Sequence, residues 1–420
     1  MKRIFTALVV LISAFAQAQI NDTVTLGTYS KNMVFYNIHV TPSIKTTVPN
    51  DDWHIAFSVR GAAFPNNTNQ SVAIRINEAF GLKLYHSTQK TPNFNTFDTT
   101  GWQGWQRMHN PDTTWTIGAF NINKNFNNYF NYGWGSYTGA PLHNIESDSS
   151  IYLIQMPDAS FRKFSVLRLV FDTAFLIQFS NLDNTGFSTM EIRKKPYRTK
   201  SFVYVNIDTK AIMDKEPPLT DWSMVFLRYN HTHLDTSNLS QDMGVLTNDA
   251  LSAYAAPASQ ITEQCANHYT FSNYIDVIGQ TMKSHPSEVL IPNLSYWTTA
   301  ATGLDKLVFT SWGSALDGTI IITRNTCQYT GINDIANASN EMLLYPVPAS
   351  DVLWIKLTTT SLPTIELFDM TGRRLLSDSP VHSTDAGAYS LDIATLLSGN
   401  YIVSTVVNGE RINKMFAIVK

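Results

Sequence analysis

Charged residues are scarce in this chain of 420 residues. They make up 15% of it, against roughly 25% in typical soluble proteins. The net charge of −3 gives no reason to expect nucleic acid or an anionic membrane surface as a partner. Aromatic residues reach 12%, and Asn, Thr and Ser are plentiful. This balance favours twisted β-sheets with aromatic-rich surfaces over a helical cytosolic enzyme.

Long apolar runs are also missing. The apolar segment from Phe5 to Ile12 is too short to span a bilayer, and no stretch of eighteen apolar residues occurs elsewhere. This segment follows Lys2 and Arg3 and precedes the small-x-small site Ala16-Gln17-Ala18. We therefore expect a signal peptide over residues 1–18, export of the chain, and no transmembrane segment.

Only two cysteines are present, Cys265 and Cys327. An even count in an exported chain permits one disulfide, which we predict between them. The alternatives are two free thiols, or a metal pair completed by His268.

Enzyme motifs are lacking as well. The chain has no G-x-S-x-G, H-E-x-x-H, P-loop or G-x-G-x-x-G sequence. Asp51 and Asp52 are adjacent, and on a strand they point to opposite faces. A catalytic pair of carboxylates that are distant in sequence, as in glycosidases, stays an open alternative. We predict no catalytic residues and no enzyme.

The last eighty or so residues carry the most specific pattern. Three short alternating runs separated by turn residues are typical of a small all-β module. The marker residues are Tyr345, Pro346 and Pro348 at its opening, Asp369 and Gly372 in a turn, Gly399 and Tyr401 at a strand entry, and Lys420 at the end.

This order resembles the C-terminal sorting domain of the type IX secretion system of Bacteroidetes. The family has a YPNP-like opening, a D-x-x-G-R/K turn, an L-x-x-G-x-Y strand entry and a basic last residue. Val347 stands where the family usually has Asn. The resemblance implies that residues 341–420 form a small Ig-like β-sandwich that the secretion machinery reads. It places the protein at the outer-membrane surface or in the extracellular space. The alternative is an ordinary Ig-like adhesive domain that stays on the mature protein.

The segment before this module contains an internal repeat. Asn37 and Trp53 lie as far apart as Asn206 and Trp222, and each Trp follows an Asp and precedes an apolar strand. Further anchors follow in the same order: Asn77 with Asn248, Gly118 with Gly279, Tyr152 with Tyr296, Lys163 with Lys306, Gly186 with Gly318, and Arg193 with Arg324. The first copy carries an aromatic, Asn-rich insertion from Gly101 to Tyr137. We interpret Trp53 and Trp222 as structural anchors, because an indole on a strand buries a large apolar area.

The repeated pattern resembles the HmuY-like family of β-rich surface proteins, some of which capture haem. The expected fold is all-β, with two tandem HmuY-like modules and the small sandwich. The expected domains are a signal peptide (1–18), a first module (19–197), a second module (198–329), a linker (330–340) and the sorting domain (341–420).

The resemblance makes haem the leading specific ligand. Haem capture needs axial His or Met ligands over the iron. His109 and His143, in the variable loops of the first copy, are the candidate pair. In the second copy, His231 and His233 would project from one face of a strand and are a weak candidate metal site. A surface-loop role is the alternative for every one of these histidines.

These patterns together predict a secreted or cell-surface binding protein without enzymatic activity. It would bind haem or another small ligand. One rival is a structural or adhesive surface protein without a ligand. The other is a carbohydrate-binding or carbohydrate-active protein that uses the aromatic insertion, since aromatic faces suit pyranose rings.

Overall fold

The chain divides into two compact units, residues 1–328 (unit 1) and 329–420 (unit 2). The computed structural model describes residues 20–61, 71–128, 130–231, 240–256, 271–284, 289–292, 294–300, 303–313, 317–328, 342–357, 365–370, 373–376, 382–384, 388–407 and 410–420. These residues form antiparallel β-sheets with short 3-10 turns, so the predicted all-β class is confirmed. The expected signal peptide, 1–18, lies outside the described residues.

Unit 1 contains two pairs of facing sheets. Central sheet 1 has the order β15 (Ala211–Met213), β14 (Phe202–Asn206), β4 (Ile55–Ser58), β5 (Ile74–Ile76). Outer sheet 1 has the order β13 (Ser188–Arg193), β12 (Ala174–Asn181), β11 (Phe161–Val170), β10 (Ser150–Gln155), β6 (Lys83–Lys90), β7 (Gln106–Met108), with β8 (Gly135–Tyr137) and β9 (Ile145–Ser147) alongside β11. Together these two sheets are the first sandwich.

The second sandwich repeats this plan. Central sheet 2 has the order β17 (Ser240–Thr247), β16 (Met224–His231), β2 (Asn32–Asn37), β3 (Ile44–Pro49). Outer sheet 2 has the order β1 (Ile20–Thr25), β23 (Thr319–Gln328), β22 (Gly303–Trp312), β21 (Ser295–Ala300), β18 (Ala253–Ala256). A two-stranded ribbon of β19 (Lys283–Ser284) and β20 (Val289–Leu290) completes it. The 3-10 turns are η1 (Thr28–Ser30), η2 (Thr91–Thr96), η3 (Trp102–Gly104), η4 (Ala119–Asn121), η5 (Lys195–Tyr197) and η6 (Leu219–Asp221).

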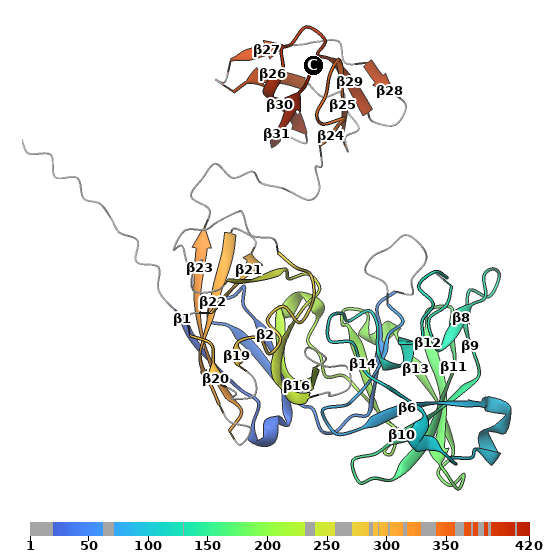
Figure 1. The fold of residues 1–420 in the computed structure, drawn as a ribbon. Coiled ribbons are helices and arrows are strands. Elements are labelled where there is room, and N and C mark those ends of the chain that lie inside the picture. Colours follow the sequence, from blue (N-terminus) through green and yellow to red (C-terminus); the bar gives the residue numbers. More distant parts are fainter. Residues whose placement is uncertain are drawn as a thin grey trace, which may run out of the picture. The chain divides into compact units, whose positions relative to one another are not determined.

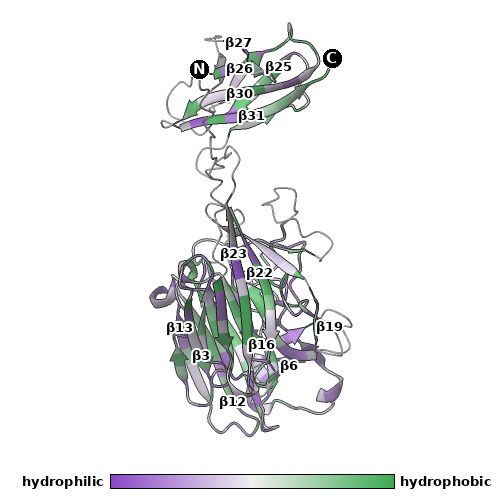
Figure 2. Cartoon of the chain, turned by 90° about the vertical axis from the view of Figure 1, so that its left-hand side faces the viewer, coloured by the Kyte–Doolittle hydropathy of each residue, from purple (hydrophilic) through white to green (hydrophobic). Residues whose placement is uncertain are grey.

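The four sheets stack in the order outer 1, central 1, central 2, outer 2, because three apolar cores lie between successive layers (Figure 1). Alternation along β4 shows why. Ile55 and Phe57 enter the core of the first sandwich, and Ala56 between them enters the core shared by the two central sheets. Strands inside the central sheets, such as β4, are therefore apolar on both faces, whereas β3 at the edge of central sheet 2 has only exposed and half-buried residues. Figure 2 shows the hydropathy of the residues along the strands. Full burial of one side chain such as Phe57 stabilises the fold by roughly 2–3 kcal/mol.

Strand pairing confirms that the repeat has a structural basis. In central sheet 1, Phe57 lies opposite Val203, and in central sheet 2, Phe226 lies opposite Val34. In the outer sheets, Lys163 lies opposite Leu153 and Lys306 opposite Trp297, and each ladder has a bulge three residues further on. The anchors Trp53 with Trp222 and Lys163 with Lys306 thus occupy equivalent places in the two sandwiches.

Each sandwich takes strands from the opposite copy, β14 and β15 in the first sandwich and β1 to β3 in the second. β2 and β3 precede Trp53 in the sequence and pair beside β16, which follows Trp222. β14 and β15 in turn pair beside β4. The first sandwich is consequently continuous in sequence from β4 to β15, and the second joins β1–β3 to β16–β23. The boundary expected at 197/198 falls between β13 and β14, which both belong to the first sandwich.

Two pairs of anchors were matched incorrectly. Gly186 follows β12, whereas Gly318 precedes β23, the counterpart of β12. Lys163 lies opposite Ser180 and Lys306 opposite Asn325, so the neighbouring Phe179 and Arg324 are equivalent. Arg193 lies on β13, whose counterpart at the edge of the other outer sheet is β1 and not the strand of Arg324. A Gly with an Arg a few residues later recurs by chance in β-rich sequences, and strand register decides the match.

Unit 2 is a small sandwich of two four-stranded sheets. One sheet has the order β24 (Leu343–Tyr345), β25 (Val352–Lys356), β29 (Ala388–Asp392), β28 (His382–Thr384). The other has the order β27 (Arg374–Leu376), β26 (Ile365–Asp369), β30 (Gly399–Val407), β31 (Glu410–Ile418). The predicted alternation is realised, since Leu353 and Ile355 enter a core that Leu367 and Val403 complete.

Candidate functional site

Two asparagines fix the chain on either side of the central layers. The Asn77 side-chain amide donates to the carbonyls of Asn50 (2.8 Å) and Trp53 (3.0 Å). The Asn248 amide donates to Leu219 (2.8 Å) and Trp222 (3.0 Å) in the same way. Each Asn thereby ties the end of one central strand to the turn before the next, and holds its Trp between the two central sheets. The anchoring role predicted for both indoles agrees with this geometry.

The two anchors differ at one hydrogen bond. The indole Nε1 of Trp53 donates to Asn50 Oδ1 at 2.9 Å. Leu219 stands at the place of Asn50 in the second copy and offers no acceptor. Among the described residues, Trp222 Nε1 is therefore buried without a partner. A buried unpaired donor costs about 1–3 kcal/mol. A bound molecule that accepts a hydrogen bond from Trp222 Nε1 would offset this cost.

Trp222 borders a cavity between the two central sheets, the central cavity. Its volume is about 70 Å³, and its walls include Trp53, Trp115, Trp222 and Phe35. Tyr229 also lines it, and among the described residues its hydroxyl has no hydrogen-bond partner either. Burial raises the pKa of Tyr229 well above its ordinary value of 10.0, so the hydroxyl stays protonated. The central cavity thus combines aromatic walls with two unpaired buried donors.

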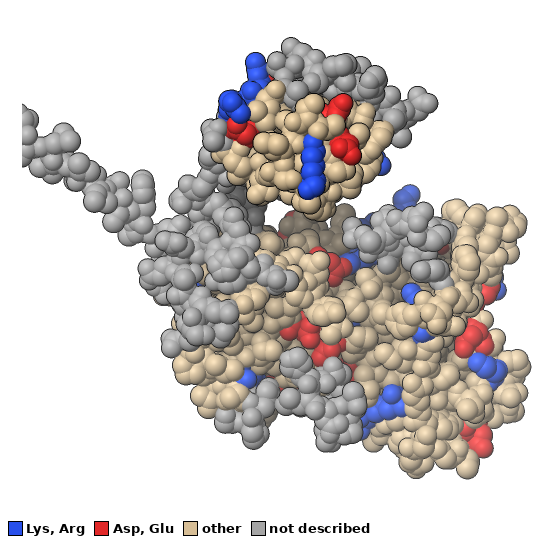
Figure 3. Space-filling model, turned by 45° about the horizontal axis from the view of Figure 1, so that its top comes forward, with Lys and Arg blue, Asp and Glu red and all other residues tan. Residues whose placement is uncertain are grey.

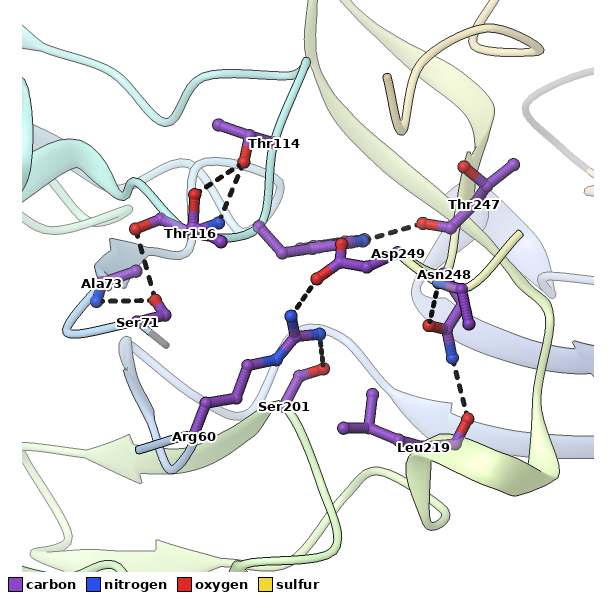
Figure 4. A network of polar contacts seen from close by, with 12 residues as sticks. Arg60, Ser71, Ala73, Thr114, Thr116, Ser201, Leu219, Thr247, Asn248 and Asp249 are labelled. Carbon is purple, nitrogen blue, oxygen red and sulfur yellow. Dashed lines mark hydrogen bonds and ion pairs between the residues drawn. The ribbon is translucent and has the colours of Figure 1, made fainter. Parts of the chain in front are cut away.

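A salt bridge also crosses between the two sandwiches. Arg60, which holds the place of Tyr229 in the first copy, contacts Asp249 of the second sandwich and donates to Ser201 Oγ at 2.8 Å (Figure 4). Nearby, Trp115 Nε1 donates to the Thr247 carbonyl at 2.8 Å across the interface. Polar contacts therefore cross between the sandwiches at Arg60 and Trp115, and both Trp115 and Ser201 also line the cavity.

A buried arginine forms part of the cavity wall. Arg75 stands over the Trp115 ring at 5.0 Å and donates to the carbonyls of Thr114 (2.9 Å), Ile117 (3.2 Å) and Pro111 (2.9 Å). Burial lowers the pKa of Arg75 to about 10, and Glu78 opposes that shift. The guanidinium stays charged at neutral pH, and its contacts tie the aromatic insertion to the cavity.

Two carboxylate–histidine pairs lie beside the central cavity, which both of their carboxylate residues, Glu78 and Asp112, line. Glu78 Oε1 contacts His109 Nδ1 at 2.7 Å and accepts from Asn230 of the second sandwich at 2.7 Å. Asp112 contacts His231 Nδ1 at 3.2 Å, and both side chains are buried. His109 and His231, predicted as ligands in separate sites, are thus each held by a carboxylate at the interface between the sandwiches.

Glu216 is a third buried carboxyl among the residues that line the cavity, after Glu78 and Asp112. It accepts hydrogen bonds from the amides of Ser201 (2.8 Å) and Phe202 (3.1 Å) and from the Tyr204 hydroxyl (2.6 Å). Burial raises its pKa to about 7, although these hydrogen bonds favour the charged form. Glu216 consequently changes charge near neutral pH.

The remaining predicted ligands are distributed elsewhere. His143 contacts the Tyr137 hydroxyl and lies against Phe171, so it has different partners from its proposed haem partner His109. His233 and Cys265 lie outside the described residues, and Cys327 is described in β23 by its backbone alone. No disulfide and no group of three or more metal-ligating side chains is seen within the described ranges. The haem pair, the His231–His233 site and the Cys265–Cys327 bridge stay predictions.

The cavity residues were missed at the level of sequence because Trp, Tyr and Leu in strands are typical of cores. The one available signal was the mismatch of Asn50 with Leu219 next to otherwise matched Trp residues. Charge gave no signal, and Figure 3 shows charged side chains sparsely spread over a mostly uncharged surface.

In unit 2 the segments that carry the sorting-domain pattern meet in space. The opening segment pairs with the last strand, since Ala349 N–H donates to the Ala417 carbonyl and Val419 N–H to the Ala349 carbonyl, both at 2.9 Å. Tyr401 Oη donates to the Leu397 carbonyl at 2.8 Å, and Lys420 N–H donates to Ser398 Oγ at 3.0 Å.

The residues around these contacts are open to solvent. Tyr345, Pro346, Pro348 and Gly399 are exposed, while Tyr401 is half-buried against Phe416. The Arg373 backbone N–H donates to Asp369 Oδ1 at 3.0 Å across the turn. Gly372, between these residues, lies outside the described residues. The opening, the strand entry and the basic end thus form one surface.

Residues 343–419 match the family model of the secretion system C-terminal sorting domain. The chain is therefore a protein exported with a sorting tail. The tail is that of the type IX secretion system, so the protein reaches the outer-membrane surface or the extracellular space. Comparison with curated proteins finds no match. Among the described residues, no helix is long and apolar enough to cross a membrane.

Proposed function

We propose that unit 1 is a non-enzymatic binding protein that takes a small ligand into the central cavity. The observation that carries the proposal is that Trp222 and Tyr229, whose Nε1 and Oη have no hydrogen-bond partner among the described residues, both line one cavity. Buried polar groups in folded proteins are nearly always paired with protein, water or ligand. A ligand with an acceptor atom would satisfy both donors and stack on the Trp residues.

The comparison of the two copies supports the same site. The two copies are symmetric at Asn77 and Asn248, whose side-chain amides donate to equivalent backbone carbonyls. The symmetry fails at the cavity, where Leu219 replaces Asn50 and Tyr229 replaces Arg60. Both replacements remove a partner that would otherwise have filled or closed the space. Selection for stability alone would favour the paired arrangement, because each unpaired donor costs free energy.

A fluorescence and thermal-shift screen of small molecules tests this proposal. Binding in the central cavity changes tryptophan emission and raises Tm, because a ligand that binds only the folded state stabilises it. Trp222→Phe and Tyr229→Phe should each weaken binding by about tenfold, since each removes one hydrogen bond. Trp102→Phe, on the far side of outer sheet 1, is the matched control and should leave the affinity unchanged. Equal affinity of all these variants would contradict the proposal.

Carbohydrate binding by the aromatic insertion is a second candidate function, favoured by one observation. Phe130 and Tyr137 stack at 5.7 Å, and Phe126, Phe130 and Phe171 are each at least half exposed. Exposed rings flanked by Asn side chains suit sugar recognition. A glycan array with Phe130→Ala as the comparison variant tests it. The haem hypothesis is tested separately by haemin titration of His109→Ala and His143→Ala variants.

A further inference from the structure

A second cavity opens beside the central cavity. This vestibule has a volume of about 200 Å³ and is lined by Tyr29, Ser30, Lys31, Asp51, Phe80 and Arg228, among others. Asn50, Ala79 and Arg228 border both spaces. A ligand can therefore extend from the vestibule into the central cavity, and the two spaces together approach the size of a small-ligand pocket.

Arg228 is a charged residue that lines the vestibule and could pair with a bound anion. Its side chain is half-buried, and among the described residues it has no carboxylate or hydrogen-bond partner. The acidic neighbours are engaged elsewhere, Asp51 with Lys31 at 3.7 Å and Glu78 with His109 at 2.7 Å. A half-buried guanidinium without a counter-ion is costly, so an anion at this place would be stabilised.

Ser30, a buried residue, lines the same vestibule. Ser30 is 3% exposed, and within the described part of the chain its Oγ has no hydrogen-bond partner. It sits in the turn η1 and lines the vestibule together with Arg228. The rings of Tyr29 and Phe80 also border this space. The vestibule thus offers a guanidinium fork, a hydroxyl donor and aromatic rings.

We infer that the ligand is a small monocarboxylate with an aromatic or apolar body, an inference that rests on the proposed function. The carboxylate accepts from the Arg228 fork and Ser30 Oγ in the vestibule, and the body enters the central cavity against Trp222. A single unpaired cation matches one negative charge, which favours a carboxylate over a phosphate dianion. The planar guanidinium fork of Arg228 can pair with both oxygens of such a carboxylate.

Matched carboxylate and amide pairs test the inference directly. Phenylacetate with phenylacetamide and indole-3-acetate with indole-3-acetamide have nearly the same shape and differ in charge. Calorimetric titration of the full chain should give at least about tenfold tighter binding of one carboxylate than of its amide. Arg228→Gln should abolish that preference, and Ser30→Ala should reduce it. Arg107→Gln, at an exposed arginine on β7, is the control and should keep it.

The outcomes separate the two proposals. Equal binding of carboxylate and amide, or a preference that survives Arg228→Gln, overturns the carboxylate inference while the cavity remains a binding site. Binding of neither member of any pair, together with an empty result in the small-molecule screen of a folded protein, overturns the proposed function itself. Circular dichroism of Arg228→Gln checks that the variant is folded.

Discussion

At the residue scale, one side chain decides whether a buried indole is paired. Asn50 accepts from Trp53, and Leu219 at the same place leaves Trp222 without a partner. The backbone of this position is used identically in both copies, because its carbonyl accepts from Asn77 in one and Asn248 in the other. The exchange of Asn for Leu therefore changes polarity without changing the local fold.

Asn50→Leu should reproduce the unpaired indole in the first sandwich. Leu already fits the equivalent place, so the expected loss of about 1–3 kcal/mol in the free energy of unfolding comes from the unpaired donor. Urea unfolding measures it. The reverse change, Leu219→Asn, should cost no stability and should weaken ligand binding, because it supplies Trp222 with an acceptor. Unchanged stability of Asn50→Leu would contradict this account of the difference.

Glu216 predicts a pH dependence of stability. Its pKa in the folded protein, about 7, exceeds the ordinary 4.5. The folded state therefore holds a proton that the unfolded chain has released between these values, and stability falls as pH rises through that window. Glu216→Gln, which can keep the contacts to Ser201, Phe202 and Tyr204, should gain stability relative to wild type by up to about 3 kcal/mol between pH 5 and 8. Denaturant unfolding at several pH values measures this, and a difference between the two proteins that does not vary with pH would rule it out.

At the element scale, each sandwich is completed by strands from the opposite copy. The strands themselves could be predicted, since the Asp-Trp runs and the alternation in residues 319–323 mark β4, β16 and β23. Their partners could not, because strand pairing is non-local. The sequence places β14 after the first copy, and only the pairing of Val203 with Phe57 assigns it to the first sandwich. For the same reason Glu78 and Asn230, which meet across the interface, gave no sequence signal as a pair.

Strand β1 provides a test of this arrangement. Val24 is fully buried opposite Ile320, which makes the first described strand an integral part of outer sheet 2. Val24→Asp should lower the free energy of unfolding by at least about 3 kcal/mol, because it buries an unpaired carboxylate. Thr25→Asp, on the exposed face of the same strand, should change it by less than about 0.5 kcal/mol. Similar small effects of both changes would show that β1 is dispensable.

At the scale of the whole molecule, export and binding belong to separate units. The described core residues of unit 2 lie between Met342 and Ile418, and its motifs converge on an exposed surface of this unit. Unit 1 holds the central cavity and the vestibule entirely within its own sheets. The sorting domain could be located from the sequence because an exposed recognition motif is local, whereas a cavity between the two central sheets is assembled from distant segments.

Truncation after Gln328 should therefore separate the two activities. The shortened protein should stay in the periplasm in folded form and keep the ligand affinity and Tm of unit 1. Cell fractionation with antibody detection locates it, and circular dichroism reports its fold. Efficient secretion of the shortened protein would remove the sorting role, and loss of the fold would show that unit 2 is needed for the core of unit 1.

The central claim is that the cavity between the central sheets is occupied by a small ligand, and a crystal structure of the naturally secreted protein tests it most directly. The account predicts non-protein density that spans the vestibule and the central cavity, within hydrogen-bond distance of Trp222 Nε1 and Tyr229 Oη and with an acidic group at Arg228. Ordered water alone at both donors, in protein that also binds no member of the carboxylate panel, would contradict it.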